Sequence, residues 1–174
     1  MTNAPVLRSN NVELVPFSEP WNMEYLYQLM KSYPYDEGLD NYPYSRAKNS
    51  GRMFWLGYVK PGVLAGVAYL CYHKDVDKWT LDAYRDDRML RTMEHQKTWS
   101  EETGKLLCDY FFSLGLCDIL YSGVDVRNKL AIKLLERLGF EKVEAGIFLN
   151  HNYTLLLKRR ESDGRTDSSD LRGK

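Results

Sequence analysis

Residues 117–140 constrain the fold more than any other part of the chain, because three structural signals follow one another there. Residues 119–126 form a short, β-prone apolar run, which is typical of a strand inside a sheet. Asn128 can cap a helix with its side-chain oxygen, and leucines at positions 130, 134, 135 and 138 share one helical face. Gly139 then ends the helix, because glycine enters the left-handed conformation at little cost. The segment predicts a buried strand, a polar turn and one amphipathic helix.

The composition predicts one globular domain of ordinary size. The 174 residues are 44% hydrophobic and 28% charged, which is enough for a packed core. Lysine plus arginine and aspartate plus glutamate both count 24, and this balance argues against nucleic acid as a partner. The sequence has neither an apolar run long enough for a membrane span nor the hydrophobic core of a signal peptide. We therefore expect a cytoplasmic monomer or homodimer without a membrane partner.

The cysteines and histidines give no signal for a metal. Cys71, Cys108 and Cys117 are odd in number and form no metal-like pair, so we expect buried, reduced thiols. The three histidines are scattered along the chain. The sequence therefore predicts neither a metal site nor a disulfide.

Hydrophobic periodicity along the chain predicts an α+β domain, with three of its strands in a meander. We expect a loose lead-in over 1–10, a charged and irregular segment over 86–99, and a flexible polar tail over 161–174 after a single domain of residues 1–160. The expected strands cover 12–17, 53–60, 63–73, 79–84, 119–126, 141–149 and 152–159, and the expected helices run from residue 18 or 19 to 32, from 100 to 114 and from 128 to 138.

The strand, the asparagine and a helix that ends in Leu138-Gly139-Phe140, with the small Ala131 three positions after Asn128, resemble the C-terminal signature of the GNAT superfamily of acyl-CoA-dependent N-acetyltransferases. The branch that acetylates protein N-termini looks nearest. The predicted order of strands and helices over residues 11–160 is also the order of that fold. The resemblance therefore implies a mixed, mostly antiparallel central sheet of about six to seven strands, flanked by three to four helices. The resemblance implies acetyl-CoA as co-substrate and a primary amine, such as a small amine or a protein N-terminus, as acceptor.

The phosphate-binding loop of the family departs most from its pattern in this chain. The resemblance places that loop at Lys97, Thr98, Trp99 and Ser100, before a helix that we expect Ser100 to cap. The family has glycine at the position of Thr98, since the backbone must approach phosphate closely there. Backbone N–H groups, the hydroxyls and Lys97 could still bind phosphate. The alternative is an ordinary loop that caps an ordinary helix.

The remaining candidate residues follow from the same resemblance. Tyr84 and Arg85 lie where the pantetheine arm would pair with a strand, and Asn128 would contact the cofactor arm or serve only as a cap. Asp82 points opposite to its apolar neighbours on the third strand of the meander, so it is a candidate base or a salt-bridged surface residue. Leu135 replaces the tyrosine that protonates the leaving thiolate in many relatives.

Residues 33–51 contain two Tyr-Pro-Tyr triplets around an acidic centre, which breaks the periodicity. A substrate loop would use Tyr35 and Tyr42 as rigid contacts and Asp36 to attract a cationic amine, whereas the alternative is a packed surface loop.

Two hypotheses from different classes of protein remain open. The first is an N-acetyltransferase of the GNAT type. The second is a catalytically inactive protein of the same fold that serves as a binding or structural component, for example in a bacteriophage. The altered phosphate loop and Leu135 favour the second, and Asn128 with the intact helix signature favours the first.

Overall fold

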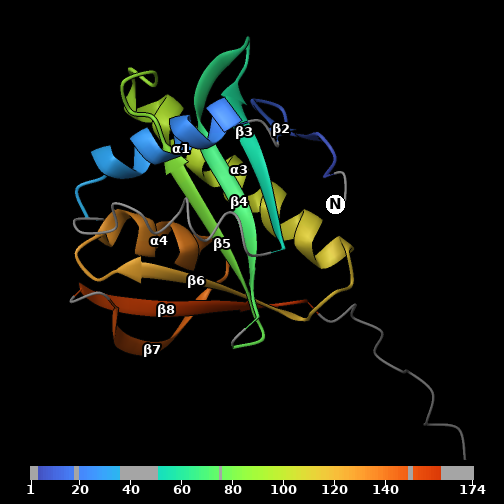
Figure 1. Ribbon diagram of the computed structural model, residues 1–174, viewed down its shortest axis with the longest axis vertical. Coiled ribbons are helices and arrows are strands. Elements are labelled where there is room, and N and C mark those ends of the chain that lie inside the picture. Colours follow the sequence, from blue (N-terminus) through green and yellow to red (C-terminus); the bar gives the residue numbers. More distant parts are fainter. Residues whose placement is uncertain (1–3, 18–19, 36–50, 75, 149–150, 162–174) are drawn as a thin grey trace, which may run out of the picture.

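The computed structural model describes residues 4–17, 20–35, 51–74, 76–148 and 151–161. Its centre is an eight-stranded sheet in the order β1-β2-β3-β4-β5-β6-β8-β7, with helices on both faces (Figure 1). The helices are α1 (Pro20–Ser32), α3 (Met93–Ser113) and α4 (Lys129–Arg137). The strands are β1 (Leu7–Arg8), β2 (Val12–Pro16), β3 (Arg52–Val59), β4 (Val63–His73), β5 (Lys78–Arg85), β6 (Ile119–Asp125), β7 (Glu141–Phe148) and β8 (His151–Arg159).

The predicted fold class is confirmed, with one more strand than expected. The additional strand is β1, which pairs antiparallel with β2 through Leu7 and Leu14. The expectation of a loose lead-in over residues 1–10 is therefore wrong for residues 7 and 8, where two residues are too few to produce a readable alternation. The tail expected over 161–174 lies outside the described residues, apart from Glu161.

The only parallel pair of strands in the described sheet is β5 with β6, and these strands diverge soon after they meet. Their register contains the single pair Thr80 and Tyr121, whereas β5 pairs with β4 over eight residues. The Ser122 hydroxyl of β6 still donates to the Leu81 carbonyl of β5 at 3.1 Å, and beyond Leu81 the register of the two strands contains no further pair. This divergence opens the middle of the sheet.

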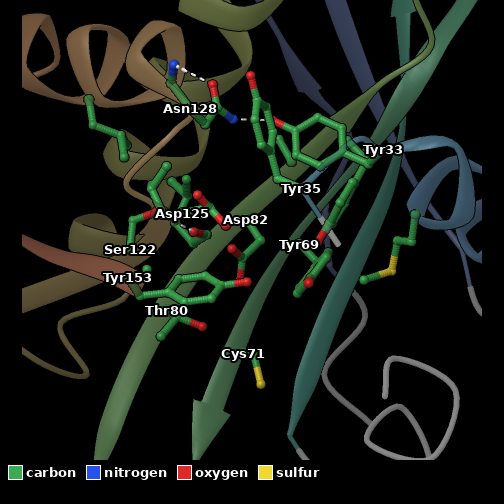
Figure 2. Close-up of a pocket in the computed structure, with 18 of the residues that line it drawn as sticks. Tyr33, Tyr35, Tyr69, Cys71, Thr80, Asp82, Ser122, Asp125, Asn128 and Tyr153 are labelled. Atoms are coloured by element: carbon green, nitrogen blue, oxygen red, sulfur yellow. Dashed lines mark hydrogen bonds between the residues drawn. The ribbon is translucent and has the colours of Figure 1, made fainter. Parts of the chain in front are cut away.

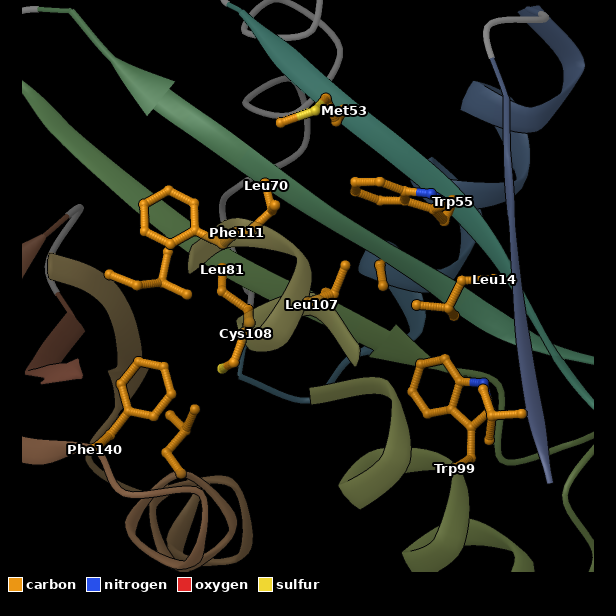
Figure 3. Close-up of a cluster of buried hydrophobic side chains, with 14 of the residues drawn as sticks. Leu14, Met53, Trp55, Leu70, Leu81, Trp99, Leu107, Cys108, Phe111 and Phe140 are labelled. Atoms are coloured by element: carbon orange, nitrogen blue, oxygen red, sulfur yellow. The ribbon is translucent and has the colours of Figure 1, made fainter. Parts of the chain in front are cut away.

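The sheet separates two hydrophobic clusters. On one face, Leu107 and Phe111 of α3 pack against Leu70 and Leu81 of β4 and β5 (Figure 3). On the other face, the buried residues Leu26, Leu29 and Met30 of α1 cover Leu56 and Val67. The alternation along the strands assigns neighbouring residues to opposite clusters, as the pleat requires.

The N-cap of helix α3 lies eight residues earlier than the sequence suggests. Thr92 is its N-cap, since the Thr92 side chain accepts a hydrogen bond from the backbone N–H of His95 at 3.1 Å. The expectations of an irregular segment up to residue 99 and of an N-cap at Ser100 are therefore wrong. The exposed first turns of α3 are almost entirely polar, so they carry no apolar stripe that would mark a helix.

Helix α4 matches the prediction at both ends. Asn128 caps it by accepting a hydrogen bond from the N–H of Ala131, and Gly139 follows it with a positive φ of 88°. The predicted apolar face is wrong at one position, because Leu130 is 74% exposed while Ile132 and Leu135 are buried. The buried face of α4 thus begins at Ile132, two residues later than the leucine spacing indicates.

Candidate active site

A pocket of about 380 Å³ lies where β5 and β6 diverge (Figure 2). Its floor is formed by β4, β5 and β6, on the face of the sheet that carries α1. The C-terminal end of α1, the first turns of α4 and Tyr153 of β8 complete its walls. With Arg52 of β3, the pocket therefore collects side chains from seven elements at the opening in the sheet.

Two carboxylates line this pocket. Asp82 comes from the middle of β5, half-buried and directly opposite Tyr69 of β4. Asp125 stands at the end of β6 and is 4% exposed. Arg127 donates to both Asp125 oxygens, from Nε at 3.0 Å and from Nη2 at 2.8 Å, and its backbone N–H donates at 2.8 Å. Asp125 is therefore an ion-paired wall residue, whereas Asp82 lies on the floor of the pocket.

Tyrosine rings form the largest part of the wall. Tyr33 packs edge-on against Tyr35 and against Tyr84, with ring centroids 5.5 Å apart in both pairs. Tyr84 stacks on Tyr69 at 6.4 Å. The guanidinium of Arg127 lies 5.5 Å from the centroid of the Tyr35 ring. The rings thus connect the end of α1 to β4, β5 and the start of α4.

Asn128 has two partners in the described structure. Its Oδ1 caps α4, and its Nδ2 donates to the hydroxyl of Tyr33. Tyr33 thereby bridges the end of α1 and the start of α4 beside the divergence of β5 and β6. The capping role that the sequence left open is confirmed, and a contact between Asn128 and a cofactor stays a proposal.

The inner end of the pocket contains residues that the sequence analysis did not select. Arg52 Nε donates to the Cys71 sulfur at 3.0 Å, and His73 Nε2 lies 2.9 Å from the hydroxyl oxygen of Thr80. The alternation along β4 places Cys71 and His73 on the face of Tyr69, a signal that was present in the sequence. Nothing in the sequence alone placed a pocket over that face.

The residues expected around the phosphates lie elsewhere than predicted. Lys97, Thr98, Trp99 and Ser100 belong to the second turn of α3, so their backbone N–H groups lie inside the helix. The mouth of the helix therefore lies at Thr92 and Met93 rather than at these residues, and phosphate binding there stays a proposal. Arg85 lines no part of the pocket; its guanidinium donates to Asp87, to the carbonyl of Gln96 and to the hydroxyl of Ser100.

Trp99 is a core residue rather than part of an open site. It is 1% exposed and lies among the buried hydrophobic side chains on the α3 face of the sheet (Figure 3). Its indole packs on the backbones of Gly57 and Gly66. A Cβ added to Gly57 would stand 2.7 Å from the indole nitrogen, and one added to Gly66 would stand 3.0 Å from the ring. Two glycines therefore make room for this one ring.

The other candidate residues divide between the pocket and the part of the chain outside the described ranges. Tyr35 and Tyr84 line the pocket, as does Leu135, which carries no proton to donate. Asp36 and Tyr42 lie outside the described residues. Cys117 is half-buried rather than buried.

Among the described residues, no group of histidine, cysteine and carboxylate side chains could hold a metal ion, and none of the helices could cross a membrane.

Comparison with known proteins identifies the fold. The sequence matches no family model and no curated protein. Among solved structures, a GNAT-family acetyltransferase from Bordetella pertussis superimposes with a TM-score of 0.65 at 15% identity, over 89% of this chain and 99% of that one. The spermidine/spermine N-acetyltransferase SpeG from Vibrio cholerae, in a mutant form, gives 0.64 at 16% identity, over 87% and 95%.

A further solved structure has the same fold. It is the Salmonella typhimurium acetyltransferase that modifies the N-terminal serine of a 50S ribosomal subunit protein, with a TM-score of 0.64 at 12% identity, over 90% of this chain and all of that one. The chain therefore has the fold of the GNAT acetyltransferases.

Proposed function

We propose that this chain transfers an acetyl group from acetyl-CoA to a primary amine bound in the pocket. The observation that carries the proposal is the place of the pocket, at the point where the only parallel strands of the described sheet separate. An extended thioester arm can lie in such an opening, because the edge of β5 has backbone groups to pair with it. Solved proteins of this fold act on amines, including spermidine and a protein N-terminus.

The walls suit a cationic acceptor. An amine entering the pocket meets the carboxylate of Asp82 and the faces of tyrosine rings, and both stabilise positive charge. Asp82 is placed to accept the proton that the amine loses when its nitrogen attacks the carbonyl carbon. The C–S bond then breaks, the acetyl group stays on the nitrogen, and coenzyme A leaves as a thiolate that takes up a proton from water.

A catalytically inactive protein of the same fold is the second candidate. One observation favours it: α3 extends through the segment where a phosphate-binding loop was expected, so the N–H groups of residues 97–100 lie within the helix rather than at its mouth. The pocket would then bind an amine-bearing partner without transferring an acyl group. A protein N-terminus suits this hypothesis as well as the first.

The test combines acetyl transfer with cofactor binding. Purified protein is incubated with acetyl-CoA and either spermidine or a serine-initiated peptide, and acetylated product is followed by mass spectrometry. We expect transfer to one of them, lowered about 100-fold or more by Asp82→Asn, since a general base contributes on this order. The control is Asp118→Asn, an exposed carboxylate paired with Arg160 at the surface.

Binding distinguishes the two candidates. Acetyl-CoA at about a hundred times its Kd would add about 2.7 kcal/mol of stability, visible as a rise in Tm. If no acetyl transfer occurs and millimolar acetyl-CoA does not change the Tm, the enzyme hypothesis is contradicted and the inactive protein remains. Transfer that is equally fast in Asp82→Asn would keep the enzyme and exclude Asp82 as its base.

A further inference from the structure

We propose that the inner end of the pocket binds an anionic group of the acceptor, so that the acceptor is a primary amine with a carboxylate a few carbon atoms from its nitrogen. The residues that would bind this carboxylate are Arg52 and His73, which both line the pocket. The inference rests on the proposed function and deepens it, because it names the class of amine. Three observations carry it, namely the position of the two residues, their chemistry, and the opposite charge of Asp82.

The pairing of the strands places the positive and the negative group on one face of the sheet. In the register, Arg52 of β3 lies opposite Cys71 of β4, and Cys71 lies opposite Thr80 of β5. Asp82 is two residues further along β5, so its side chain is on the same face, about 7 Å along the strand from Thr80. Figure 2 shows Cys71 and Thr80 on the far side of Asp82 from Asn128. The inner end of the pocket therefore begins two residues beyond the candidate base.

Two contacts hold the polar side chains of the inner end. The Nε of Arg52 donates to the Cys71 sulfur at 3.0 Å, and the Nε2 of His73 lies 2.9 Å from the hydroxyl oxygen of Thr80. Arg52, His73 and Thr80 are half-buried, and Cys71 is 1% exposed. Side chains that are already held in one orientation lose little conformational entropy when a ligand binds. The inner end is therefore a preorganised polar site.

The chemistry of Arg52 and His73 suits an anion. A guanidinium keeps its positive charge at neutral pH, and its planar fork of N–H groups matches the geometry of a carboxylate. An imidazole adds a ring N–H donor beside it. A thiol is only a weak acceptor, so the contact with Cys71 orients the guanidinium of Arg52 but is much weaker than a bond to a carboxylate. An anionic group at the inner end would therefore gain charge-assisted hydrogen bonds.

The charges that face the pocket are of opposite sign at its two parts. Asp82 supplies the negative charge of the floor, since the other carboxylate, Asp125, is ion-paired with Arg127 at 2.8 Å. An acceptor with its ammonium at Asp82 and its carboxylate at Arg52 would be attracted at both ends. A diamine in the same orientation would place its second ammonium against the guanidinium, which is repulsive. The pocket should therefore select zwitterionic amines over polyamines.

The experiment compares three acceptors of equal chain length, namely 5-aminopentanoate, its neutral amide 5-aminopentanamide, and 1,5-diaminopentane. The kcat/KM for acetyl transfer from acetyl-CoA is measured for each. We expect the carboxylate to exceed the amide by about tenfold, because hydrogen bonds to a charged group are stronger than those to a neutral one. The diamine should be the poorest acceptor of the three. An amide or a diamine that reacts as well as the carboxylate would overturn the inference.

Arg52→Gln tests whether the preference comes from this residue. We expect the ratio of kcat/KM for the carboxylate to that for the amide to fall to about threefold or less. Arg137→Gln is the matched control, because Arg137 is an exposed arginine paired with Glu101, and it should keep the wild-type ratio. Arg52→Lys keeps the charge but not the fork, so it should keep part of the preference. If Arg52 only supports the fold, Arg52→Gln would lower both rates together, and an unchanged ratio would overturn the inference.

Binding separates a failure of the inference from a failure of the proposed function. By calorimetry we expect 5-aminopentanoate to bind the wild type about tenfold more tightly than the amide does, and Arg52→Gln to remove this difference. If no acceptor is acetylated and the difference in binding is present, the proposed function fails and the anion site stands. If all three acceptors are acetylated equally, the enzyme stands and the inference fails. Neither transfer nor binding of 5-aminopentanoate at millimolar concentration would contradict both.

Discussion

Tyr33 is the residue whose contact most affects access to Asn128. Its hydroxyl accepts the hydrogen bond from Asn128 Nδ2, while the other side-chain atom of Asn128 caps α4. A cofactor arm that used the amide of Asn128 would have to displace Tyr33. At the scale of single residues, the hydrogen bond between Tyr33 and Asn128 thus joins the end of α1 to the start of α4 and covers the amide of Asn128.

Tyr33→Phe removes that hydrogen bond and keeps the ring. We expect tighter binding of acetyl-CoA, up to about tenfold, because a hydrogen bond of about 1 kcal/mol no longer competes for Asn128. Calorimetric titration of acetyl-CoA measures the effect. Tyr35→Phe is the control, since the described contacts of Tyr35 are made by its ring. Equal affinities of the wild type and Tyr33→Phe would show that Asn128 does not meet the arm.

Asp86 makes stability depend on pH. Hydrogen bonds from Arg88, with a further one from the Tyr25 hydroxyl, hold the pKa of this buried carboxyl below its usual range. Its contribution to stability is therefore present above the unfolded pKa, about 3.9, and is lost as the pH falls through the folded pKa. Unfolding by urea is measured from about pH 7 down to about pH 3.

We expect Asp86→Asn to lower the free energy of unfolding by about 1–3 kcal/mol at neutral pH and by less at the acid end. Asp87→Asn is the control, because Asp87 is an exposed carboxylate one residue away. A difference between Asp86→Asn and the wild type that stays constant with pH would mean that ionisation of Asp86 is not the cause.

At the scale of elements, the N-terminal part of α3 contacts the sheet through the ring of Trp99, which packs on two glycines. Gly66 also has a φ of 156°, and a Cβ there would meet the carbonyl oxygen of Tyr84 at 2.1 Å. Gly57 has no such backbone restriction and meets only the indole of Trp99. Gly57 is therefore the position at which the contact between strand and helix can be tested alone.

A double-mutant cycle measures this contact. We expect Gly57→Ala to lower the free energy of unfolding by about 1–3 kcal/mol, since the added methyl group overlaps the ring of Trp99. In the background of Trp99→Leu the same change should cost less, giving a coupling of about 1 kcal/mol or more between the two sites. Chemical denaturation of the four proteins gives the values. Additive effects would mean that the ring does not occupy the space above Gly57.

The strengths and failures of the sequence-based prediction have different physical origins. The strands and the helix over residues 128–138 could be predicted from the sequence, because burial of one face makes apolar residues recur at a regular spacing. The start of α3 was not readable, since its first two turns pack only one residue, Trp99, into the core. The sequence predicted only part of the pocket. It identified Asp82, Tyr84 and Asn128 as candidate site residues, whereas Cys71, His73 and Tyr153 could be identified only once the order of strands in the sheet was known.

At the scale of the whole molecule, the two hydrophobic clusters share strands. Trp55 and Leu56 are consecutive on β3 but pack into opposite clusters, and on β4 Leu70 faces α3 while Val67 faces α1. Loss of either cluster would expose one face of the same strands to water. The described part of residues 1–160 should therefore unfold as one cooperative unit, as the expectation of a single domain requires.

Thermal unfolding tests this cooperativity. We expect the near-ultraviolet and far-ultraviolet circular dichroism transitions to coincide, and the calorimetric and van't Hoff enthalpies to agree. Leu70→Ala and Val67→Ala remove buried methyl groups from opposite faces, and each should lower the Tm of that one transition, by about 2–4 °C per kcal/mol lost. A variant that splits the transition would show that α1 or α3 can leave the sheet while the other remains. The pocket, which is walled by α1 and floored by strands packed on α3, would then form only when both helices are in place.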